Sequence, residues 1–400
     1  MAGHPPSSIL HPRRILVRGT NWLGDAVLTT PALLRLRERF PDAHITLLTP
    51  DKLHDLWTNH PAVDETISFS PGENLFAVGR KLRRWGERPR EPNLAHQNTA
   101  AAREDARPTK FDVALMLPNS PRSAIETWLA GIPQRIGYAR PWRNFFLTRT
   151  IAPRAGAVKM RKRSVAEIQG LIAGEQIGNR KSEIGNSTAH QIHEYLRLVA
   201  ALGANPEPLT PQLLITPDEV KAAKKKFGLE NIAGPVFGLN PGAEYGPAKR
   251  WPVENFIAAA KEIQQRTNCA WLIFGGIADT PLAAQLESAL RSPLSALRNL
   301  SGQTSLRELM ALLKLCRVLL TNDTGPMHVA AALGTPVVVP FGSTSPELTG
   351  PGLPGGGLNL LLKSDAPCSP CFLRECPIDF RCMNGISVER VVEAVLEFKL

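Results

Sequence analysis

Residues 322–345 form the stretch best suited to chemistry. They read NDTGPMHVAAALGTPVVVPFGSTS, which predicts a polar turn followed by a short apolar helix. Pro326 stands near the first helical position, and Gly334 stands just past the predicted end. Such helix starts bind phosphate, because unpaired backbone N–H groups and the positive end of the helix dipole coincide there. An ordinary strand–helix–strand joint, with Asp323 or Thr324 as the N-cap, fits the same residues.

The carboxylate of Asp25, early in the chain, also lies near the predicted start of a helix. A predicted strand at 14–18 leads through the loop GTNWLGD into an amphipathic helix at about 26–40, so Asp25 lies at a helix start. The helix dipole favours the ionised form, which accepts a proton or a hydrogen bond. Its position alone leaves two alternatives: Asp25 has a catalytic role, or it only accepts hydrogen bonds from the backbone amides of the first helical turn. Gly19 and Gly24 alone do not make a G-x-G-x-x-G fingerprint, which disfavours a nicotinamide enzyme.

Cysteines form the third group of reactive side chains. Four of the six crowd into CSPCFLRECPIDFRC, at Cys368, Cys371, Cys376 and Cys382. A C-x-x-C pair followed by two more cysteines is compatible with a zinc or iron–sulfur site. Reduced thiols that stabilise a loop explain the same spacing, because the cytoplasm disfavours disulfides.

Composition predicts a globular chain with an anionic partner. The 400 residues exceed a usual single core, so two domains are expected, and the formal net charge is +11. Basic clusters occur at 81–90, 140–149 and 159–163, although each one alone fits an ordinary solvated surface. No zinc-finger, helix-turn-helix or aromatic RNA-binding signature favours nucleic acid as a partner. Neither a bilayer-spanning apolar run nor an export signal is found, so a cytoplasmic location is expected.

Strands and helices alternate through both halves of the chain. Predicted strands lie at 14–18, 43–48, 65–69, 111–117 and 135–138 in the first half, and at 236–239, 270–274, 318–320 and 336–340 in the second. This alternation predicts two parallel sheets covered by helices, with ligands bound at the carboxyl ends of the strands. The proline-rich stretch ANPEPLTPQ is the predicted hinge.

The predicted fold class is therefore α/β, with two doubly wound Rossmann-like domains facing an interdomain cleft. The first domain is expected over 1–205, with polar insertions at about 86–110 and 173–189, and the second over 206–385. A C-terminal helix in 386–400 is expected to pack back on the first domain. This layout is the GT-B arrangement, with the acceptor on the N-terminal domain and the donor on the C-terminal one. By layout alone, two-domain binding proteins and sugar-nucleotide epimerases remain open.

Four strings found in order narrow these alternatives. They are LVRGTNWLGDAVLTTPAL from Leu16, LPNSPRSA from Leu117, LNPGAEYGPAKRWP from Leu239 and NDTGPMHVAAALGTPVVVPFGSTSP from Asn322. With them the chain resembles the lipopolysaccharide heptosyltransferases of glycosyltransferase family nine, and more closely their heptosyltransferase II subgroup. The resemblance spans nearly the whole chain except the insertions and the first dozen residues.

The resemblance implies an inverting transfer of L-glycero-D-manno-heptose from ADP-heptose to heptosyl-Kdo-lipid A, in lipopolysaccharide inner-core synthesis. One carboxylate must take the proton of the attacking hydroxyl, and positive charge or N–H groups must steady the departing diphosphate. Alternatives are another transferase of the family, of the heptosyltransferase I or III type, a sugar-nucleotide epimerase, or a non-catalytic nucleotide-binding protein.

The resemblance also assigns residues. It places the catalytic base at Asp25 and a lysine against the donor diphosphate at Lys249. Packing is the default expectation for His328 inside its helix. The full set of expected donor-binding residues is Lys249, Arg250, Asp279 on the adenosine ribose, Asp323, Thr324, Gly325 and His328, with Thr344 and Ser345 as neighbours.

Acceptor-binding residues are expected at strand ends of the first domain, where each arginine also fits a solvated surface. They are Arg18, Asn119, Ser120, Arg122, Arg135 and Arg143. No cofactor is required, although magnesium is compatible with the diphosphate. Relatives often carry a His where this chain has Phe380, which weakens a Cys/His ligand scheme for a structural metal. Peripheral contact with the inner face of the cytoplasmic membrane is expected through Arg83, Arg84 and Trp85.

Overall fold

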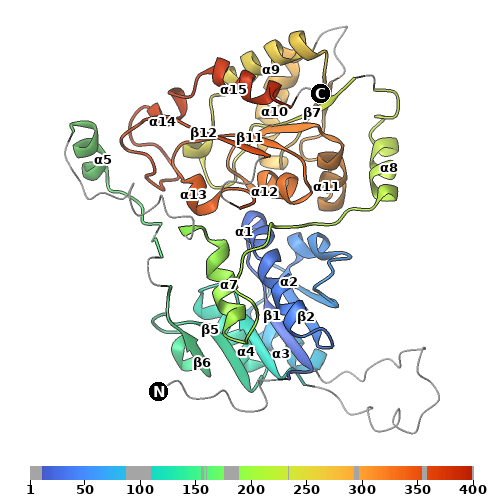
Figure 1. Cartoon of the computed structure of the whole chain (residues 1–400), viewed down its shortest axis with the longest axis vertical. Coiled ribbons are helices and arrows are strands. Elements are labelled where there is room, and N and C mark those ends of the chain that lie inside the picture. The colour runs from blue at the N-terminus through green and yellow to red at the C-terminus, as the bar shows by residue number, and fades with distance from the viewer. Residues whose placement is uncertain are drawn as a thin grey trace. The chain divides into compact units, whose positions relative to one another are not determined.

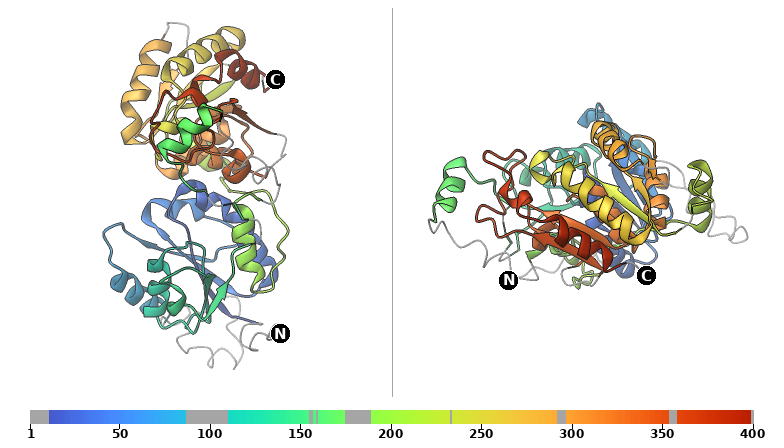
Figure 2. Two further views of the ribbon diagram at one scale, coloured as in Figure 1. Left: turned by 90° about the vertical axis from the view of Figure 1, so that its left-hand side faces the viewer. Right: turned by 90° about the horizontal axis from the view of Figure 1, so that it is seen from above.

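The structure is a computed structural model that describes residues 11–86, 110–154, 157–158, 160–174, 189–232, 234–291, 297–353 and 358–398. The predicted polar insertions fall almost entirely outside these residues. The chain divides into two compact units (Figures 1 and 2). Unit 1 comprises Met1–Asn21, Thr29–Ala155 and Ile192–Pro208, and unit 2 comprises Trp22–Leu28, Gly156–Gln191 and Leu209–Leu400. The segment that carries Asp25 therefore belongs to unit 2, although it follows the first strand of unit 1.

Unit 1 is built on a six-stranded parallel sheet with the order β3-β2-β1-β4-β5-β6. The strands are β1 (Arg14–Arg18), β2 (His44–Pro50), β3 (Glu65–Phe69), β4 (Val113–Met116), β5 (Gln134–Tyr138) and β6 (Arg149–Ile151). The helices are α2 (Thr30–Arg39), α3 (Leu75–Gly86), α4 (Pro121–Leu129) and α7 (Ile192–Ala200), with 3-10 turns η2 (Asp51–Trp57) and η5 (Asn144–Phe146). Helix α2 packs on α7, and α3 packs on α4.

Unit 2 contains a second six-stranded parallel sheet, with the order β12-β11-β10-β7-β8-β9. Its strands are β7 (Val236–Asn240), β8 (Ala270–Ile273), β9 (Leu297–Asn299), β10 (Val318–Thr321), β11 (Val337–Phe341) and β12 (Asn359–Lys363). The longer helices are α5 (Val165–Ile172), α8 (Pro217–Lys226), α9 (Val253–Thr267), α10 (Thr280–Leu290), α11 (Leu306–Leu315), α12 (Gly325–Ala332) and α15 (Val388–Leu396). Shorter elements are α1 (Leu23–Leu28), α13 (Pro346–Thr349), α14 (Arg381–Asn384), η7 (Pro247–Lys249) and η8 (Ile277–Asp279).

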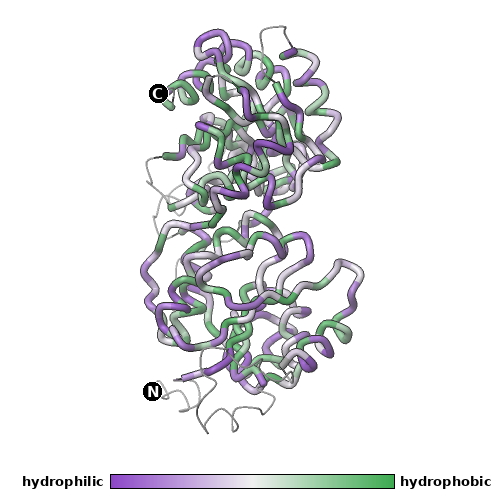
Figure 3. Tube along the Cα trace, turned by 90° about the vertical axis from the view of Figure 1, so that its right-hand side faces the viewer, coloured by the Kyte–Doolittle hydropathy of each residue, from purple (hydrophilic) through white to green (hydrophobic). Residues whose placement is uncertain are grey.

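The predicted pair of doubly wound sheets is confirmed. Strands such as β1, β10 and β11 are apolar and buried along nearly their whole length, as expected when helices cover both faces of a parallel sheet. Figure 3 shows hydrophobic residues concentrated inside each unit. The edge strands β6, β9 and β12 escaped prediction. Strands β6 and β9 have only three residues each, with little apolar signal, and β12 is a short leucine run without polar alternation. Within the part of the chain that the structure describes, no helix is long and apolar enough to span a bilayer.

One local prediction was wrong. The helix expected at about 26–40 is broken at Thr29 into α1 and α2, which belong to different units. The C-terminal helix α15 packs on α9 and β11 within unit 2, and its expected packing on the first domain stays a prediction. Its apolar side, including Val391, Val392 and Val395, lies in the core cluster of unit 2, where the periodicity of the helix finds its partner.

Candidate active site

Two short helices of unit 2, α1 and α12, pack closely because each has a glycine at their contact. A Cβ atom on Gly24 would lie 2.6 Å from Cδ2 of His328, and one on Gly325 would lie 2.9 Å from Cδ2 of Leu23. Neither distance is tolerated between real atoms, so larger residues would push the helices apart. The two glycines therefore keep Asp25, on α1, beside the beginning of α12.

Asp25 has a defined orientation and an altered acidity. Nε2 of Gln191 donates a hydrogen bond to its Oδ1 at 3.1 Å. Burial raises the pKa of the Asp25 carboxyl, while the Gln191 hydrogen bond and the charge of Lys249 lower it and Asp323 raises it again, with a raised pKa as the net result. A carboxylate with a raised pKa accepts a proton more readily than an exposed aspartate does.

Lys249 lies at the end of η7 and is held by a carboxylate and an aromatic ring. Its Nζ lies 2.6 Å from Oδ2 of Asp323 and 4.9 Å from the centre of the Tyr245 ring. The same Oδ2 accepts a hydrogen bond from Oγ1 of Thr344 at 2.5 Å. Because Asp323 directly precedes Thr324 at the start of α12, this ion pair places the ammonium group beside the free amides of that helix. Asp323 orients Lys249 and does not cap the helix with its side chain.

A second cation reaches the same tyrosine. The guanidinium carbon of Arg374 lies 5.1 Å from the centre of the Tyr245 ring, and the Tyr245 hydroxyl donates to the Phe372 carbonyl at 2.9 Å. The ring is thus fixed at its hydroxyl end and contacts two positive charges through its π system. Lys249 and Arg374 together make this wall suitable for a doubly charged anion.

A cavity of about 400 Å³ opens over these groups, entirely within unit 2. It brings together seven residues selected from the sequence, which are Asp25, Lys249, Asp323, Thr324, Gly325, His328 and Thr344. Sequence reasoning missed Gln191, Tyr245, Arg374 and Lys162, which also line it. Tyr245, Lys162 and Arg374 lie inside strings that were noticed for other reasons, whereas no spacing signal marks Gln191.

His328 serves the packing of α1 against α12 and also lines the cavity. The side chain is buried against the position of Gly24, and burial lowers the pKa of His328 to about 4. The imidazole is therefore neutral near pH 7. Its Nδ1 atom has no hydrogen-bond partner among the described residues.

Three expected donor neighbours lie elsewhere in unit 2. Nη2 of Arg250 lies 3.7 Å from Oδ1 of Asp279, whose Oδ2 accepts the Gly276 N–H at 3.0 Å, and neither charged residue lines the cavity. Ser345 is buried, and its hydroxyl donates to Glu347 at 2.6 Å. The donor role of Arg250 and Asp279 stays a prediction.

The expected acceptor residues of unit 1 form an internal ion network. Arg18 and Glu126 are buried, and Nε of Arg18 lies 3.1 Å from Oε2 of Glu126. Nε of Arg122 approaches Oε1 of the same carboxylate at 2.6 Å, and the Arg18 guanidinium lies over the Phe69 ring. Glu126, which the sequence did not single out, therefore links two arginines between β1 and α4. Because Arg18 is enclosed, its structural role is to join these elements.

Arg143, Asn119 and Ser120 are also engaged within unit 1. Ser120 caps α4 by accepting the Ser123 N–H at 3.3 Å. Nη1 of Arg143 donates to the Pro118 carbonyl at 2.9 Å and to the Asn119 side chain at 3.3 Å. Arg143 is fully buried, and burial lowers the pKa of its guanidinium to about 10. Its Nε and Nη2 atoms have no partner among the described residues, so the loop carries a buried cation that is only partly satisfied.

Arg135 lies at the wrong end of its strand for the predicted acceptor site. It is the second residue of β5, whereas Asn119 follows the carboxyl end of the parallel strand β4. Its Nε donates to the Phe146 carbonyl at 2.7 Å, and its Nη1 donates to the Ile132 carbonyl at 2.5 Å. The side chain thus ties two loops together at the amino edge of the sheet, which corrects its expected grouping with Asn119.

The four C-terminal cysteines lie close together in unit 2. Cys368, Cys371, Cys376 and Cys382 line one small cavity of about 10 Å³ and are all free thiols. Burial raises the pKa values of Cys368 and Cys371, and that of Cys382 to about 12. In the described ranges, no group of three or more Cys, His, Asp or Glu residues is placed to hold a metal. The two interpretations, a bound metal and thiols that stabilise the loop, both stay predictions.

Comparisons with known proteins agree on one family. The family model for glycosyltransferase family 9 (heptosyltransferase) matches residues 176–380. Lipopolysaccharide heptosyltransferase 2 of Escherichia coli strain K12 is 30% identical over 346 residues, covering 84% of this chain and 85% of that protein. Lipooligosaccharide heptosyltransferase 2 of Haemophilus influenzae is 28% identical over 341 residues, with coverage of 84% and 85%.

Solved structures confirm the fold. The structure of E. coli ADP-heptose LPS heptosyltransferase II matches with a TM-score of 0.70 and 26% identity, covering 96% of this chain and 98% of that one. A family 9 glycosyltransferase from Veillonella parvula matches with a TM-score of 0.71 at 21% identity, which supports the fold alone. The predicted GT-B class is thereby confirmed, and the chain belongs to glycosyltransferase family 9, the heptosyltransferases.

Proposed function

We propose that this enzyme transfers L-glycero-D-manno-heptose from ADP-heptose to the heptose of heptosyl-Kdo-lipid A. Support comes from the E. coli and H. influenzae relatives, whose names describe heptosyltransferase 2 acting on lipopolysaccharide and lipooligosaccharide. The observation that carries the proposal is the cavity of unit 2 in which the carboxylate of Asp25 and the ammonium of Lys249 line the same space.

In this mechanism Asp25 removes the proton from the attacking hydroxyl of the acceptor. The hydroxyl oxygen forms a bond to the anomeric carbon of the donor heptose, and the bond from that carbon to the phosphate oxygen breaks with inversion. The proton moves to Asp25, and the electron pair of the broken bond leaves with ADP. The raised pKa and the hydrogen bond from Gln191 suit the carboxylate to this task, because one makes it more basic and the other fixes its direction.

The leaving diphosphate needs positive charge rather than a strong acid. Lys249 supplies an ammonium group that Asp323 already holds in place, and Arg374 supplies a second cation through the shared Tyr245 ring. Backbone N–H groups at the beginning of α12 add dipoles directed at an anion. Charges that are fixed before the reaction stabilise the departing group without reorganising. The mechanism requires no metal ion, and magnesium is compatible with the diphosphate.

Product analysis separates this proposal from its alternatives. Purified protein is incubated with ADP-heptose and heptosyl-Kdo-lipid A, and ADP and the extended lipid are followed by mass spectrometry. Release of ADP together with a lipid heavier by one heptose is expected. Conversion of the donor without acceptor would indicate an epimerase, and binding without product would indicate a nucleotide-binding protein. Transfer only to Kdo-lipid A, or only to a further extended core, would indicate a heptosyltransferase I or III type.

The proposed acceptor is a lipid, so the proposal includes peripheral contact with the inner face of the cytoplasmic membrane. Arg83, Arg84 and Trp85 at the end of α3 combine positive charge with an amphipathic aromatic ring, which suits an anionic interface. Flotation of the protein with anionic liposomes is expected to weaken as salt rises. Flotation that is insensitive to salt would contradict an electrostatic contact.

A further inference from the structure

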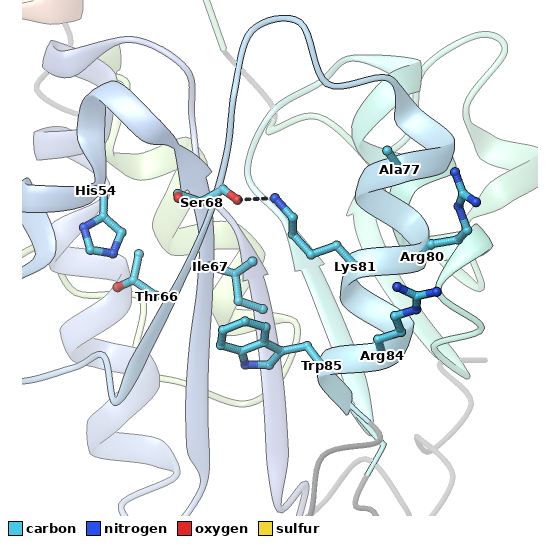
Figure 4. A pocket seen from close by; sticks show the side chains of 9 residues that line it. All are labelled: His54, Thr66, Ile67, Ser68, Ala77, Arg80, Lys81, Arg84 and Trp85. Carbon is cyan, nitrogen blue, oxygen red and sulfur yellow. Dashed lines mark hydrogen bonds between the residues drawn. The ribbon is translucent and has the colours of Figure 1, made fainter.

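A second cavity, of about 730 Å³, lies wholly within unit 1, along the edge strand β3. Its wall is formed by β3, by His54 of η2 and by one side of α3 (Figure 4). It lies beside the middle of β3, so it is separate from the strand ends where Asn119 and Ser120 follow β4. Among the described strands β3 pairs only with β2, which leaves its other side without a strand neighbour.

The lining combines a cationic rim with an apolar floor. Arg80, Lys81 and Arg84 come from consecutive turns of α3, and Figure 4 shows Lys81 and Trp85 reaching from that helix toward β3. Ile67 supplies the buried apolar surface of the strand, and the full lining is His54, Thr66, Ile67, Ser68, Ala77, Arg80, Lys81, Arg84 and Trp85. Among the described residues, no carboxylate lines the cavity.

The nearby acidic groups are already matched to other partners. Glu73 accepts from Nζ of Lys81 at 2.9 Å, and that ammonium also donates to the Ser68 carbonyl at 3.0 Å. Asp55 lies 3.2 Å from Nδ1 of His54. Arg80 and Arg84 are different: neither makes an ion pair or a hydrogen bond with any residue in the described part of the chain. Two guanidinium groups four residues apart on a helix repel each other by a few tenths of a kcal/mol.

Helix geometry explains only part of this arrangement. A cation in the last turn of α3 interacts favourably with the negative end of the helix dipole, which accounts for Arg84 and for its neighbour Arg83. It does not account for Arg80, one turn earlier. Two guanidinium groups beside one cavity match the several oxygens of a phosphate group, to which arginine binds in a bidentate manner.

We propose that this cavity binds a phosphate ester carried by a polyol or a sugar. The phosphate lies between Arg80 and Arg84, and the carbon-bearing body of the ligand packs on Ile67 and Trp85. A cavity of about 730 Å³ is far larger than a lone phosphate and has the size of a small-molecule site. Thr66 and Ser68 provide hydroxyl groups for a polyol. The inference stands apart from heptosyl transfer, because it concerns binding to unit 1 only.

Two sources of such a group are chemically equivalent: a soluble phosphate ester and the headgroup of an anionic phospholipid. The soluble arm measures binding of glycerol 3-phosphate and glucose 6-phosphate to the whole protein by calorimetry. The lipid arm measures flotation with phosphatidylglycerol–phosphatidylcholine vesicles, with and without glycerol 3-phosphate as competitor. Binding of the soluble esters assigns a free ligand, and binding to vesicles alone assigns the headgroup. Either result supports the site provided that the variants below behave as expected.

The decisive comparison is Arg84→Gln against Arg39→Gln, which remove the same charge from two helices of unit 1. Arg39, the last residue of α2, does not line the cavity. We expect Arg84→Gln, and likewise Arg80→Gln, to weaken binding at least about tenfold, and Arg39→Gln to change it less than about threefold, in line with charge-assisted hydrogen bonds of roughly 1.5–3 kcal/mol. Equal losses in Arg39→Gln and Arg84→Gln would show diffuse surface charge and overturn the proposal. Failure of wild-type protein to bind either probe would overturn it as well.

Discussion

The carboxyl ends of the two sheets carry similar charged residues and use them in opposite ways. In unit 2, Asp25, Lys249 and Asp323 line a cavity, and their interactions leave one side open to a ligand. In unit 1, Arg18 and Glu126 are enclosed and bonded to each other. The same fold thus leaves charged side chains beside an open cavity in one unit and pairs them internally in the other.

The difference follows from what packs over each set of strand ends. In unit 2, Gly24 and Gly325 let α1 approach α12 through backbone, which leaves polar side chains on the rim of a cavity. In unit 1, α4 begins directly after β4 and brings Glu126 over the last residue of β1, so the opposite charges neutralise each other. Charge type and position in the strand are therefore insufficient to identify a reactive site; the open space beside the charge decides.

The strongest test of the proposed active site in unit 2 is Asp25→Asn. We expect transfer to fall by about 10²–10⁴-fold, because a general base contributes a factor of that size, while ADP affinity changes only a few-fold. ADP release from ADP-heptose and heptosyl-Kdo-lipid A measures the rate, and calorimetry measures ADP binding. Asp218→Asn is the matched control, since it changes an exposed aspartate of the same unit outside the cavity. Normal turnover by Asp25→Asn would remove the base from the mechanism.

The strongest test of the buried ion network of unit 1 is Glu126→Gln. Removing one partner of a buried ion pair costs about 3–5 kcal/mol, because Arg18 is left enclosed without a counter-charge. Hydrogen exchange of the β1 and α4 amides in the whole protein should report a loss of local stability near that size. Glu38→Gln, which breaks an exposed pair with Arg35, should cost about 1 kcal/mol or less. Comparable exchange in both variants would show that the network does not hold unit 1 together.

Lys249→Gln probes whether positive charge in the cavity serves the leaving group. Loss of one preorganised donor is expected to lower kcat/KM by about 10²-fold, comparable with removal of a single oxyanion donor. The neutral amide keeps a hydrogen-bond donor near Asp323, so folding should be preserved. Lys261→Gln removes an exposed lysine charge of the same unit that does not line the cavity, and it should change kcat/KM only a few-fold. If the two variants lose activity equally, Lys249 has no special contact with the diphosphate.

Much of this architecture could be predicted from the sequence. The two sheets follow from apolar strands alternating with amphipathic helices, and the position of Asp25 near a helix start follows from a polar loop before a helix. The break at Thr29 was missed because the residues on both sides keep an apolar helical pattern, although Thr29 followed by Pro31 is a helix-start signal. The assignment of α1 to unit 2 depends on a close contact made by Gly24 and Gly325, which are far apart in the sequence.

Some residues of the candidate site could likewise be predicted from the sequence, and others could not. Asp25, Lys249 and Thr324 were found because each lies in a string with a recognisable role, and the structure places them beside one cavity. Arg18 and Arg122 were expected at the acceptor because isolated arginines near strand ends suggest an anion. Their partner Glu126 lies within α4 with no local signal, so only the folded chain shows that these arginines already have a counter-charge.

The smallest expected effect, and the finest test of the difference between the two units, concerns Gln191. Its hydrogen bond lowers the pKa of Asp25, whose net shift is upward because burial is the larger cause. A base with a raised pKa loses activity as the pH falls through that value, so the acid limb of kcat/KM should lie above the ordinary range for aspartate. Gln191→Leu removes the opposing hydrogen bond, which should raise the pKa further and move the acid limb to still higher pH.

At pH values above the acid limbs of both the wild-type and the Gln191→Leu profiles, this variant should lower kcat/KM only a few-fold, since the base itself is intact. Gln303→Leu, an exposed change in the same unit, should leave the pH profile where it is. A purely structural role for Gln191 predicts a uniform loss at all pH values with no movement of the limb. That uniform loss would mean that the hydrogen bond of Gln191 stabilises the structure of unit 2, as Glu126 stabilises unit 1. Gln191 would then belong to a closed structural network and not to an open site whose carboxylate titrates.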